Sequence, residues 1–196
     1  QAEVLAMSSD EAEQQHHLGN IHESIDRANR LTEQLLTLAR LDPMQALPDA
    51  QPIDWQRSAH QALQSVNLQA REKRVQLKLE CACGFGQVFP PLGNEVLLQL
   101  MLRNLLDNAI RYSPPNSHVT LTLAANGLSV CDEGPGIAAE HLPRIRERFY
   151  RPPGQSQQGS GLGLSIVERI ADLHGLRLDL ANADERGLCV HMIKAV

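Results

Sequence analysis

The sequence predicts an α/β sandwich over residues 54–196, preceded by one helix of a truncated helical hairpin. Two observations predict this arrangement. Apolar residues recur every three or four positions over residues 11–41, which is the period of an amphipathic helix. Beyond residue 54, segments with that period alternate with short segments in which apolar residues take every second position, as in strands.

The first helix is expected to pack its apolar side against another helix. No Pro or Gly interrupts residues 20–42, and Pro43 ends the helical pattern. The apolar residues at helical spacing are Leu18, Ile21, Ile25, Ala28, Leu31, Leu35 and Leu38. One helix cannot bury such a stripe alone, residues 1–7 are too short to cover it, and residues 8–10 (Ser-Ser-Asp) are typical of a turn. We therefore expect a helical hairpin that is cut near its start and completed by a second copy of the chain.

A linker, three helices and five strands are predicted after the first helix. Residues 43–53 contain three prolines among small polar residues, which indicates a linker. Asp54 is the expected N-cap of the next helix, and Asn126-Gly127 the expected turn of a hairpin. The helices are expected at 54–74, 93–112 and 161–174, and the strands at 75–80, 119–124, 128–132, 176–180 and 188–193.

Composition excludes several classes of protein. The 18 Lys and Arg residues against 23 Asp and Glu residues give a net charge of −5, a poor match for nucleic acid. No segment approaches the roughly 20 apolar residues that span a bilayer. The chain begins with Gln1 rather than Met, so we expect a part of a longer protein, whose other part can contain a membrane segment. The four cysteines, Cys81, Cys83, Cys131 and Cys189, lack the spacing of a zinc site and are expected to be reduced, mostly buried thiols.

Polar residues share one face of the helix predicted at 93–112. Asn104, Asn108, Arg111 and Tyr112 stand at positions i, i+4, i+7 and i+8. Two amides, a guanidinium and a phenol can offer a metal ligand, phosphate donors and a contact to a base. The alternative is an ordinary solvated face.

An acidic, glycine-containing segment directly follows a predicted strand. It reads Asp-Glu-Gly-Pro-Gly-Ile over residues 132–137. Gly134 and Gly136 let the backbone approach a flat ligand, and Asp132 can accept a hydrogen bond from the amino group of adenine. Guanine presents an acceptor at that position and would be disfavoured. The alternative is an ordinary turn.

A polar loop leads into a glycine-rich segment that opens the helix predicted at 161–174. Residues 159–165 read Gly-Ser-Gly-Leu-Gly-Leu-Ser, and backbone amides at a helix N-terminus bind anions. Its late position argues against a dinucleotide-binding loop. Residues 152–160 consist only of Pro, Gly, Gln and Ser, with Arg148 and Arg151 before them, which is typical of a nucleotide lid or, alternatively, of a disordered linker.

In this order, the four segments resemble the N, G1, F and G2 boxes of bacterial two-component sensor histidine kinases. The ATPase domain of that family has the Bergerat fold of the GHKL superfamily, which also contains gyrase B, Hsp90 and MutL. Residues 25–28 and 34–41 resemble the second helix of the dimerisation domain, and residues 148–154 with 159–167 are most similar to the QseC subgroup. The resemblance implies three regions, which are partial dimerisation and phosphotransfer helices lacking the phosphoacceptor His (1–42), a linker (43–53) and an ATP-binding catalytic domain (54–196).

The resemblance implies ATP and Mg²⁺ as ligands and assigns roles to residues of this sequence. Asn108 is expected to bind Mg²⁺, and Asp132 is expected to bind the adenine amino group. Arg148 and Arg151 are expected to reach the terminal phosphates as the lid closes. The implied ligand-binding residues are Asn104, Asn108, Arg111, Tyr112, Asp132, Gly134, Gly136, Ile137, Arg148, Arg151, Gly159, Ser160, Gly161, Leu162, Gly163 and Leu164.

The sequence departs from the family pattern at several positions. Glu133 stands where the family commonly has Asn, Arg146 where it often has Phe, and a glycine-rich turn is reduced to Gly187. Neither His22, although Glu23 follows it, nor the pair at 16–17 continues the family's phosphoacceptor motif. We expect surface histidines at these positions, an acceptor upstream of Gln1, no autophosphorylation of this chain alone, and no catalytic residue within it that can be named.

The preferred interpretation is the ATP-binding part of a histidine kinase that transfers the γ-phosphoryl group to a His and then to an Asp of a response regulator. Asn104 is an amide and cannot act as the general base that hydrolytic relatives need, which argues against an ATP-hydrolysing or anti-sigma relative. A degenerate nucleotide-binding dimerisation module is the non-enzymatic alternative. The interpretation implies a homodimer, no nucleic acid as partner, and the cytoplasmic portion of a bacterial inner-membrane protein that meets the membrane only through segments outside this sequence.

Overall fold

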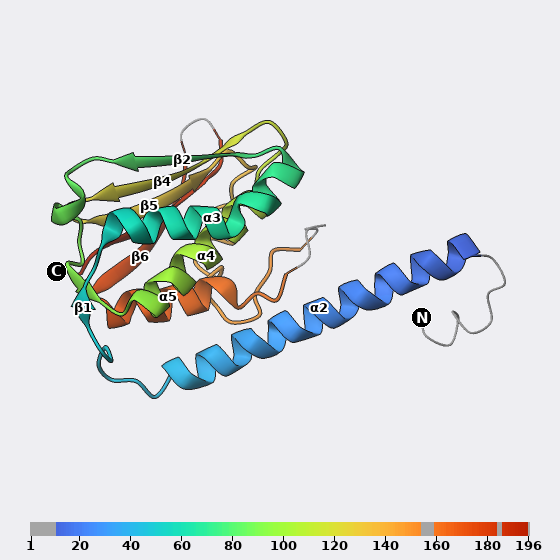
Figure 1. Cartoon of the computed structure of the whole chain (residues 1–196), viewed down its shortest axis with the longest axis horizontal. Helices are drawn as coiled ribbons and strands as arrows, with labels where there is room; N and C mark the ends of the chain where they lie inside the picture. The colour runs from blue at the N-terminus through green and yellow to red at the C-terminus, as the bar shows by residue number, and fades with distance from the viewer. Residues whose placement is uncertain (1–10, 154–158, 184–185, 196) are drawn as a thin grey trace. The chain divides into compact units, whose positions relative to one another are not determined.

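The computed structural model describes residues 11–153, 159–183 and 186–195 (Figure 1). The chain divides into two compact units, Gln1–Arg40 and Leu41–Val196. The predicted turn at 8–10, the segment 1–7 and part of the predicted lid lie outside the described residues. So do the side chains of the histidines at 16, 17 and 22.

The predicted first helix is confirmed as α2, Glu11–Leu41. Among its described apolar side chains, Leu18, Ile25 and Leu35 of the predicted stripe are 42–52% exposed. Thr32 and Thr37 donate their hydroxyl hydrogens to backbone oxygens one turn earlier, so these two polar groups are satisfied within the helix. The structure thus shows a long amphipathic helix with much of its apolar stripe in contact with solvent.

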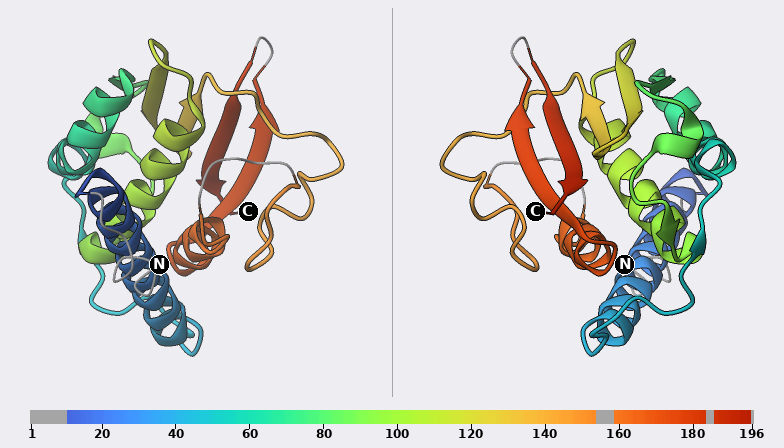
Figure 2. Two further views of the ribbon diagram at one scale, coloured as in Figure 1. Left: turned by 90° about the vertical axis from the view of Figure 1, so that its right-hand side faces the viewer. Right: turned by 90° about the vertical axis from the view of Figure 1, so that its left-hand side faces the viewer.

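The predicted α/β fold is confirmed in the second unit, where three helices lie on one face of a mixed five-stranded sheet (Figure 2). The strand order is β2-β4-β5-β7-β6, and only β2 and β4 run parallel. The helices are α3 (Trp55–Lys73), α4 (Glu95–Tyr112) and α5 (Gly163–Leu173). The strands are β2 (Gln76–Cys81), β4 (His118–Ala124), β5 (Gly127–Asp132), β6 (Leu176–Asn182) and β7 (Leu188–Lys194).

The core lies between α4 and the sheet. Leu98, Met101, Leu102, Leu105, Leu106 and Ile110 of α4 are all 0–2% exposed. In β4, buried and half-buried residues alternate, as expected of a strand with one face on the core. Because α4 packs against both α3 and α5, its remaining polar face is held in a fixed position beside the N-terminus of α5.

Helix ends follow the capping residues of the sequence. The Asp54 side chain accepts a hydrogen bond from Arg57 N at 3.0 Å, which confirms the predicted N-cap of α3. Asn94 caps α4 in the same way through Leu97 N. The buried His174 at the end of α5 accepts from Asn94 N through Nε2 at 3.1 Å and donates from Nδ1 to Ile170 O, so it joins the ends of two helices.

The sequence did not reveal a small second sheet. Gln51–Pro52 (β1) pairs with Leu92–Gly93 (β3), so the predicted linker contains a short strand. The buried Trp55 lies nearby and donates its indole N–H to Pro90 O at 2.8 Å. A ladder of two residues is too short for a repeating pattern, which is why periodicity could not show it.

The prediction of four reduced, mostly buried thiols was wrong. Cys131 and Cys189 form a disulfide between β5 and β7, and both are half-buried, as are the free Cys81 and Cys83. The strand register places Cys131 directly opposite Cys189, with 4.1 Å between their Cα atoms. The two cysteines are 58 residues apart, and spacing in the sequence gives no sign of such a pairing.

Candidate functional site

The polar face of α4 carries the four residues that the sequence singled out. Asn104, Asn108, Arg111 and Tyr112 are all half-buried, on the side of the helix away from its buried leucines. Asn104 Nδ2 donates to Leu100 O at 2.8 Å, so the side-chain amide is oriented by its own helix.

The C-terminal end of this face is held by a lysine that sequence reasoning missed. Lys73, the last residue of α3, donates from Nζ to the backbone oxygens of Ile110, at 2.9 Å, and Arg111. Burial lowers the pKa of Lys73, and the neighbouring Arg111 guanidinium lowers it further. A cation at this position satisfies carbonyls that have no partner within the helix.

The glycine-rich segment lies against the polar face of α4. A Cβ added to Gly163 would lie 3.3 Å from Asn108 Nδ2 and 3.4 Å from Asn104 Oδ1. A Cβ added to Gly159 would lie 3.0 Å from Arg111 Nη1. The structure therefore brings together two amides and a guanidinium of α4 with glycine backbone from a segment far away in the sequence.

The residues at the start of α5 leave backbone N–H groups available beside α4. Ser160 Oγ accepts a hydrogen bond from Leu162 N, the Leu162 side chain is fully buried, and Leu164 is half-buried. The helix begins at Gly163, slightly later than predicted, so the preceding glycines stay in the loop. Backbone N–H groups in the first turn of a helix lack intrahelical partners and favour anions.

Asp132 lies at the end of β5 with 9% of its surface exposed. Its Oδ1 accepts hydrogen bonds from Gly134 N at 2.8 Å and Leu188 N at 3.2 Å. Among the residues that the structure describes, none donates to Oδ2. Burial raises the pKa of the Asp132 carboxyl above its ordinary value, and the two backbone donors oppose that rise. A buried carboxylate with one oxygen fixed and the other uncommitted can accept a hydrogen bond from a ligand.

Gly134 connects this carboxylate to α4. A Cβ at Gly134 would lie 2.7 Å from Tyr112 O and 2.8 Å from Asp132 Oδ1, so a side chain is excluded here. Gly136 has φ +70°, and Ile137 next to it is bonded to Asn182. The segment with Asp132, predicted to bind the base, therefore lies at the C-terminal end of α4, at Tyr112. The glycine-rich segment, predicted to bind phosphate, lies beside Asn104 and Asn108 of the same helix.

Glu133, the departure from the family pattern, is committed to other groups. Its carboxylate accepts hydrogen bonds from His118, through the backbone N at 3.2 Å and the ring at 3.3 Å, and from Arg186 at 3.4 Å. Burial alone would raise the pKa of Glu133, but these donors together hold it below its ordinary value. The additional negative charge beside Asp132 is therefore balanced by these donors.

The two arginines of the predicted lid have different partners. Arg151 donates to Gly159 O at 3.2 Å and so lies beside the glycine-rich segment. Arg148 instead forms an ion pair with Asp42 at 2.7 Å. Arg146, which stands where the resemblance implies that the family often has Phe, pairs with Glu168 of α5 at 3.3 Å.

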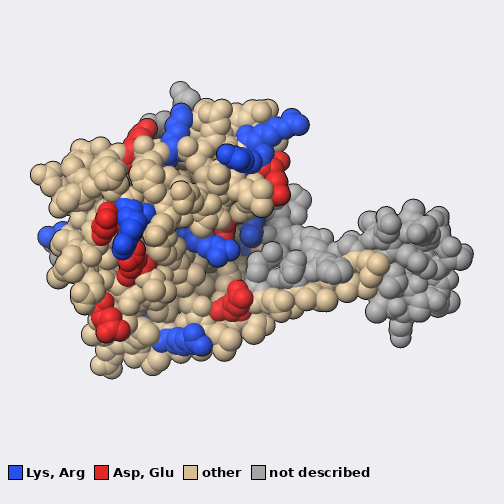
Figure 3. All heavy atoms as spheres, in the orientation of Figure 1, with Lys and Arg blue, Asp and Glu red and all other residues tan. Residues whose placement is uncertain are grey.

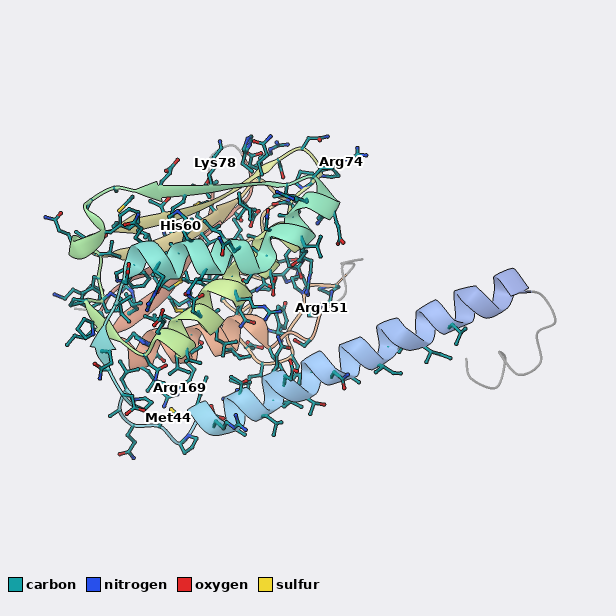
Figure 4. The ribbon with its side chains drawn as sticks, viewed as in Figure 1. Met44, His60, Arg74, Lys78, Arg151 and Arg169 are labelled. Atoms are coloured by element: carbon teal, nitrogen blue, oxygen red, sulfur yellow. A yellow bond between two sulfur atoms is a disulfide. The ribbon has the colours of Figure 1, made fainter. Side chains whose placement is uncertain are left out.

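The residues that follow α2 are tied to the second unit beside this lid. Arg169 of α5 donates to the backbone oxygens of Leu41, Asp42 and Met44 (Figure 4). Phe149 N donates to Gly161 O at 3.0 Å, which joins the two ends of the predicted lid. A Cβ at Gly161 would lie 2.7 Å from the Phe149 carbonyl carbon, so this closure requires glycine.

No acidic metal cluster occurs within the described ranges, where no three His, Cys, Asp or Glu residues gather to hold an ion. The helices described here include none long and apolar enough to cross a membrane. Figure 3 shows Lys and Arg interspersed with Asp and Glu on the visible face.

Comparison with known proteins points to one family. The profile of the histidine kinase-, DNA gyrase B- and HSP90-like ATPases matches residues 93–195. Sensor protein QseC of Escherichia coli is 44% identical over 188 residues, and QseC of Salmonella typhimurium is 46% identical over 188 residues. These matches cover 95% of this chain and 41% of each relative, so the chain spans about two fifths of their length. The swarming motility regulation sensor protein RssA of Serratia marcescens is 34% identical over 194 residues, with 96% of this chain and 40% of that protein covered.

Solved structures agree with this assignment. The cytoplasmic segment of histidine kinase QseC matches 87% of this chain and 93% of its own, with a TM-score of 0.60 and 34% identity. Full-length ShkA in complex with AMPPNP matches 98% of this chain and 42% of its own, with a TM-score of 0.74 and 25% identity.

Proposed function

Because the chain belongs to the histidine kinase-, DNA gyrase B- and HSP90-like ATPase family, we propose that residues 54–196 bind Mg·ATP and donate its γ-phosphoryl group to a histidine. The observation that carries this proposal is the position of Gly159 and Gly163 beside Asn104, Asn108 and Arg111 of α4, so close that an added Cβ would lie 3.0–3.4 Å from these side chains. The similarity to sensor kinases, and to ShkA, which was solved with an ATP analogue, favours this ligand over other anions.

The base is proposed to bind beside Asp132. Its uncommitted Oδ2 would accept a hydrogen bond from the adenine amino group, while Gly134 and Leu188 hold Oδ1. Guanine carries a carbonyl at the corresponding position, and two acceptors facing each other in a buried pocket are unfavourable. The pocket is therefore expected to select ATP over GTP.

The phosphates are proposed to bind between α4 and the start of α5. Arg111 and Arg151 would neutralise charge, and backbone N–H groups at 159–163 would donate to phosphate oxygens. Mg²⁺ fits the donors present, because it prefers oxygen ligands and is usually held by few protein groups together with phosphates and water. Asn108, with Asn104 beside it, would supply amide oxygen, and the ion would neutralise the phosphates during transfer.

Transfer to a histidine is favoured over hydrolysis by the polar face of α4. An amide at Asn104 cannot remove a proton from water, and its Nδ2 is bonded to the helix backbone. The site can then position and neutralise the triphosphate, which is most of what phosphoryl transfer requires. We propose that the accepting His lies outside this sequence and that a response regulator Asp receives the phosphoryl group next.

The remaining proposals concern the whole protein. The exposed apolar stripe of α2 would pack in a homodimer, which is the usual use of such a stripe. By similarity to the sensor kinases, this chain would be the cytoplasmic portion of a bacterial inner-membrane protein.

One experiment tests the proposed function. The chain is titrated with ATP and GTP, each with and without Mg²⁺, and then incubated with γ-labelled ATP. Mg²⁺-dependent binding of ATP, weaker binding of GTP and no label on the chain are expected. Adding the upstream helix should then restore labelling. Failure to bind either nucleotide would favour a degenerate dimerisation module, and label on this chain would show that one of its own histidines is the acceptor.

A further inference from the structure

Asn182, the last residue of β6, binds both backbone polar groups of Ile137. Its Oδ1 accepts from Ile137 N at 2.9 Å, and its Nδ2 donates to Ile137 O at 2.7 Å. The two residues are 45 positions apart, and the paired bonds fix the orientation of the amide. Two bonds to one residue hold the position of the backbone more tightly than one bond would.

Gly136 provides the space for this amide. A Cβ at Gly136 would lie 2.7 Å from Asn182 Oδ1 and 3.2 Å from Gly187 O. The glycine also has φ +70°, a conformation that L side chains rarely adopt. The lack of a side chain at Gly136 and the presence of Asn182 are thus parts of one local arrangement.

The same hairpin also holds the other end of the segment. Leu188, which is opposite Asn182 in the β6–β7 ladder, donates its N–H to Asp132 at 3.2 Å. Arg186 bonds to Glu133. The hairpin, drawn in red in Figure 2, therefore contacts residues 132–137 at both ends: Asp132 through a backbone donor, and Ile137 through a side chain.

We propose that Asn182 is a positioning residue for the nucleotide base, acting through Ile137 and Gly136. This inference depends on the proposed function, since it concerns the same pocket. Without the amide, residues 133–137 lose their attachment at one end and sample more conformations. The entropy lost when a base orders them again weakens binding. The phosphate side is held by α4 and α5, so it is not affected.

The test compares Asn182→Leu and Asn182→Asp with the wild-type chain. Leu has a side chain of similar size and removes both hydrogen bonds. Asp keeps the acceptor for Ile137 N and places a carboxylate oxygen against Ile137 O. The matched controls are Asn67→Leu and Asn67→Asp, because Asn67 is exposed on α3, away from the pocket. Affinities are measured for Mg·ATP, Mg·GTP, adenosine and Mg·tripolyphosphate, and thermal unfolding is recorded for every variant.

We expect Asn182→Leu to weaken the binding of ATP and of adenosine by about tenfold, which is the order expected when binding must also order groups that were previously held in place. Tripolyphosphate affinity should stay at the wild-type value, and the preference for ATP over GTP should fall. Unchanged ATP affinity would overturn the inference. So would an equal loss for ATP and tripolyphosphate with a lower unfolding temperature, because that pattern describes general destabilisation. A wild-type chain that does not bind ATP would instead overturn the proposed function itself.

A double-mutant cycle tests the coupling of Asn182 to Gly136 independently. Gly136→Ala should lower the affinity for ATP in the wild-type background, because the added methyl group would lie 2.7 Å from Asn182 Oδ1. In the Asn182→Ala background the same change should have a smaller effect, since that contact is gone. Additive effects would show that the two positions act separately and would overturn the proposed mechanism.

Discussion

Replacing Asp132 by Asn tests the base pocket with a change of one oxygen to an NH₂ group. The amide oxygen can still accept from Gly134 N and Leu188 N, so the side chain should keep its orientation. The new Nδ2 then takes the place of Oδ2. It is a hydrogen-bond donor and would face the adenine amino group, which is also a donor. Loss of the hydrogen bond should cost about 1–3 kcal/mol, which corresponds to a roughly 5-fold to 150-fold weaker Kd.

The stability of the variant separates a binding effect from unfolding. Burial raises the folded-state pKa of Asp132, so its contribution to stability is present at low pH and is lost as pH rises through that pKa. At neutral pH the ionised carboxylate is therefore a cost, and the neutral amide should leave the unfolding temperature equal or higher.

The assay is calorimetric titration of wild type, Asp132→Asn and the control Asp179→Asn with ATP and with GTP. Asp179 is an exposed acid of β6 whose carboxylate accepts from Leu180 N, so its replacement matches the chemistry outside the pocket. We expect ATP to weaken only in Asp132→Asn and GTP to gain relative to ATP. Wild-type affinity for ATP in that variant, or equal losses for ATP and GTP, would refute the assigned role.

Three further predictions concern other parts of the second unit. Asn108→Ala should remove the dependence of ATP affinity on Mg²⁺ and leave metal-free binding unchanged; a persistent Mg²⁺ effect in titrations would exclude Asn108 as the ligand. Asp42→Asn releases Arg148 from an exposed ion pair, so that Arg148 can reach the terminal phosphate. The affinity for ATP should rise by up to about fivefold and the affinity for ADP should not, as measured by competition binding. Burial lowers the folded-state pKa of His174, so the unfolding free energy should decrease as pH falls below about 6.5, where the unfolded state takes up the proton first. Denaturant titrations at several pH values should find a smaller pH dependence in His174→Gln than in wild type.

Local patterns predicted the elements of this fold well. The period of the apolar residues placed α2, α4 and α5, and Asn126-Gly127 marked the hairpin of β4 and β5. The polar face of α4 and the glycines before α5 were identified without any knowledge of their contact, because helix position and glycine content are local properties. The structure adds that these segments lie side by side.

Partners that depend on strand register could not be predicted. The contact of Asn182 with Ile137 uses backbone groups of Ile137, and a backbone partner leaves no mark on the residue type. Backbone groups are also involved where Lys73 of α3 donates to the carbonyl oxygen of Ile110 in α4, and where Leu188 N donates to Asp132. The disulfide between Cys131 and Cys189 depends on the pairing of β5 with β7, which no spacing in the sequence encodes.

The hydrogen bond from Phe149 N to Gly161 O has a consequence for how the chain tolerates change in length. It joins the two ends of the intervening segment, so additional residues there extend a loop that is already closed. Doubling the length of such a loop costs only about 0.6 kcal/mol. Short inserts between Pro153 and Gly159 should therefore leave α4, α5 and Asp132 in place.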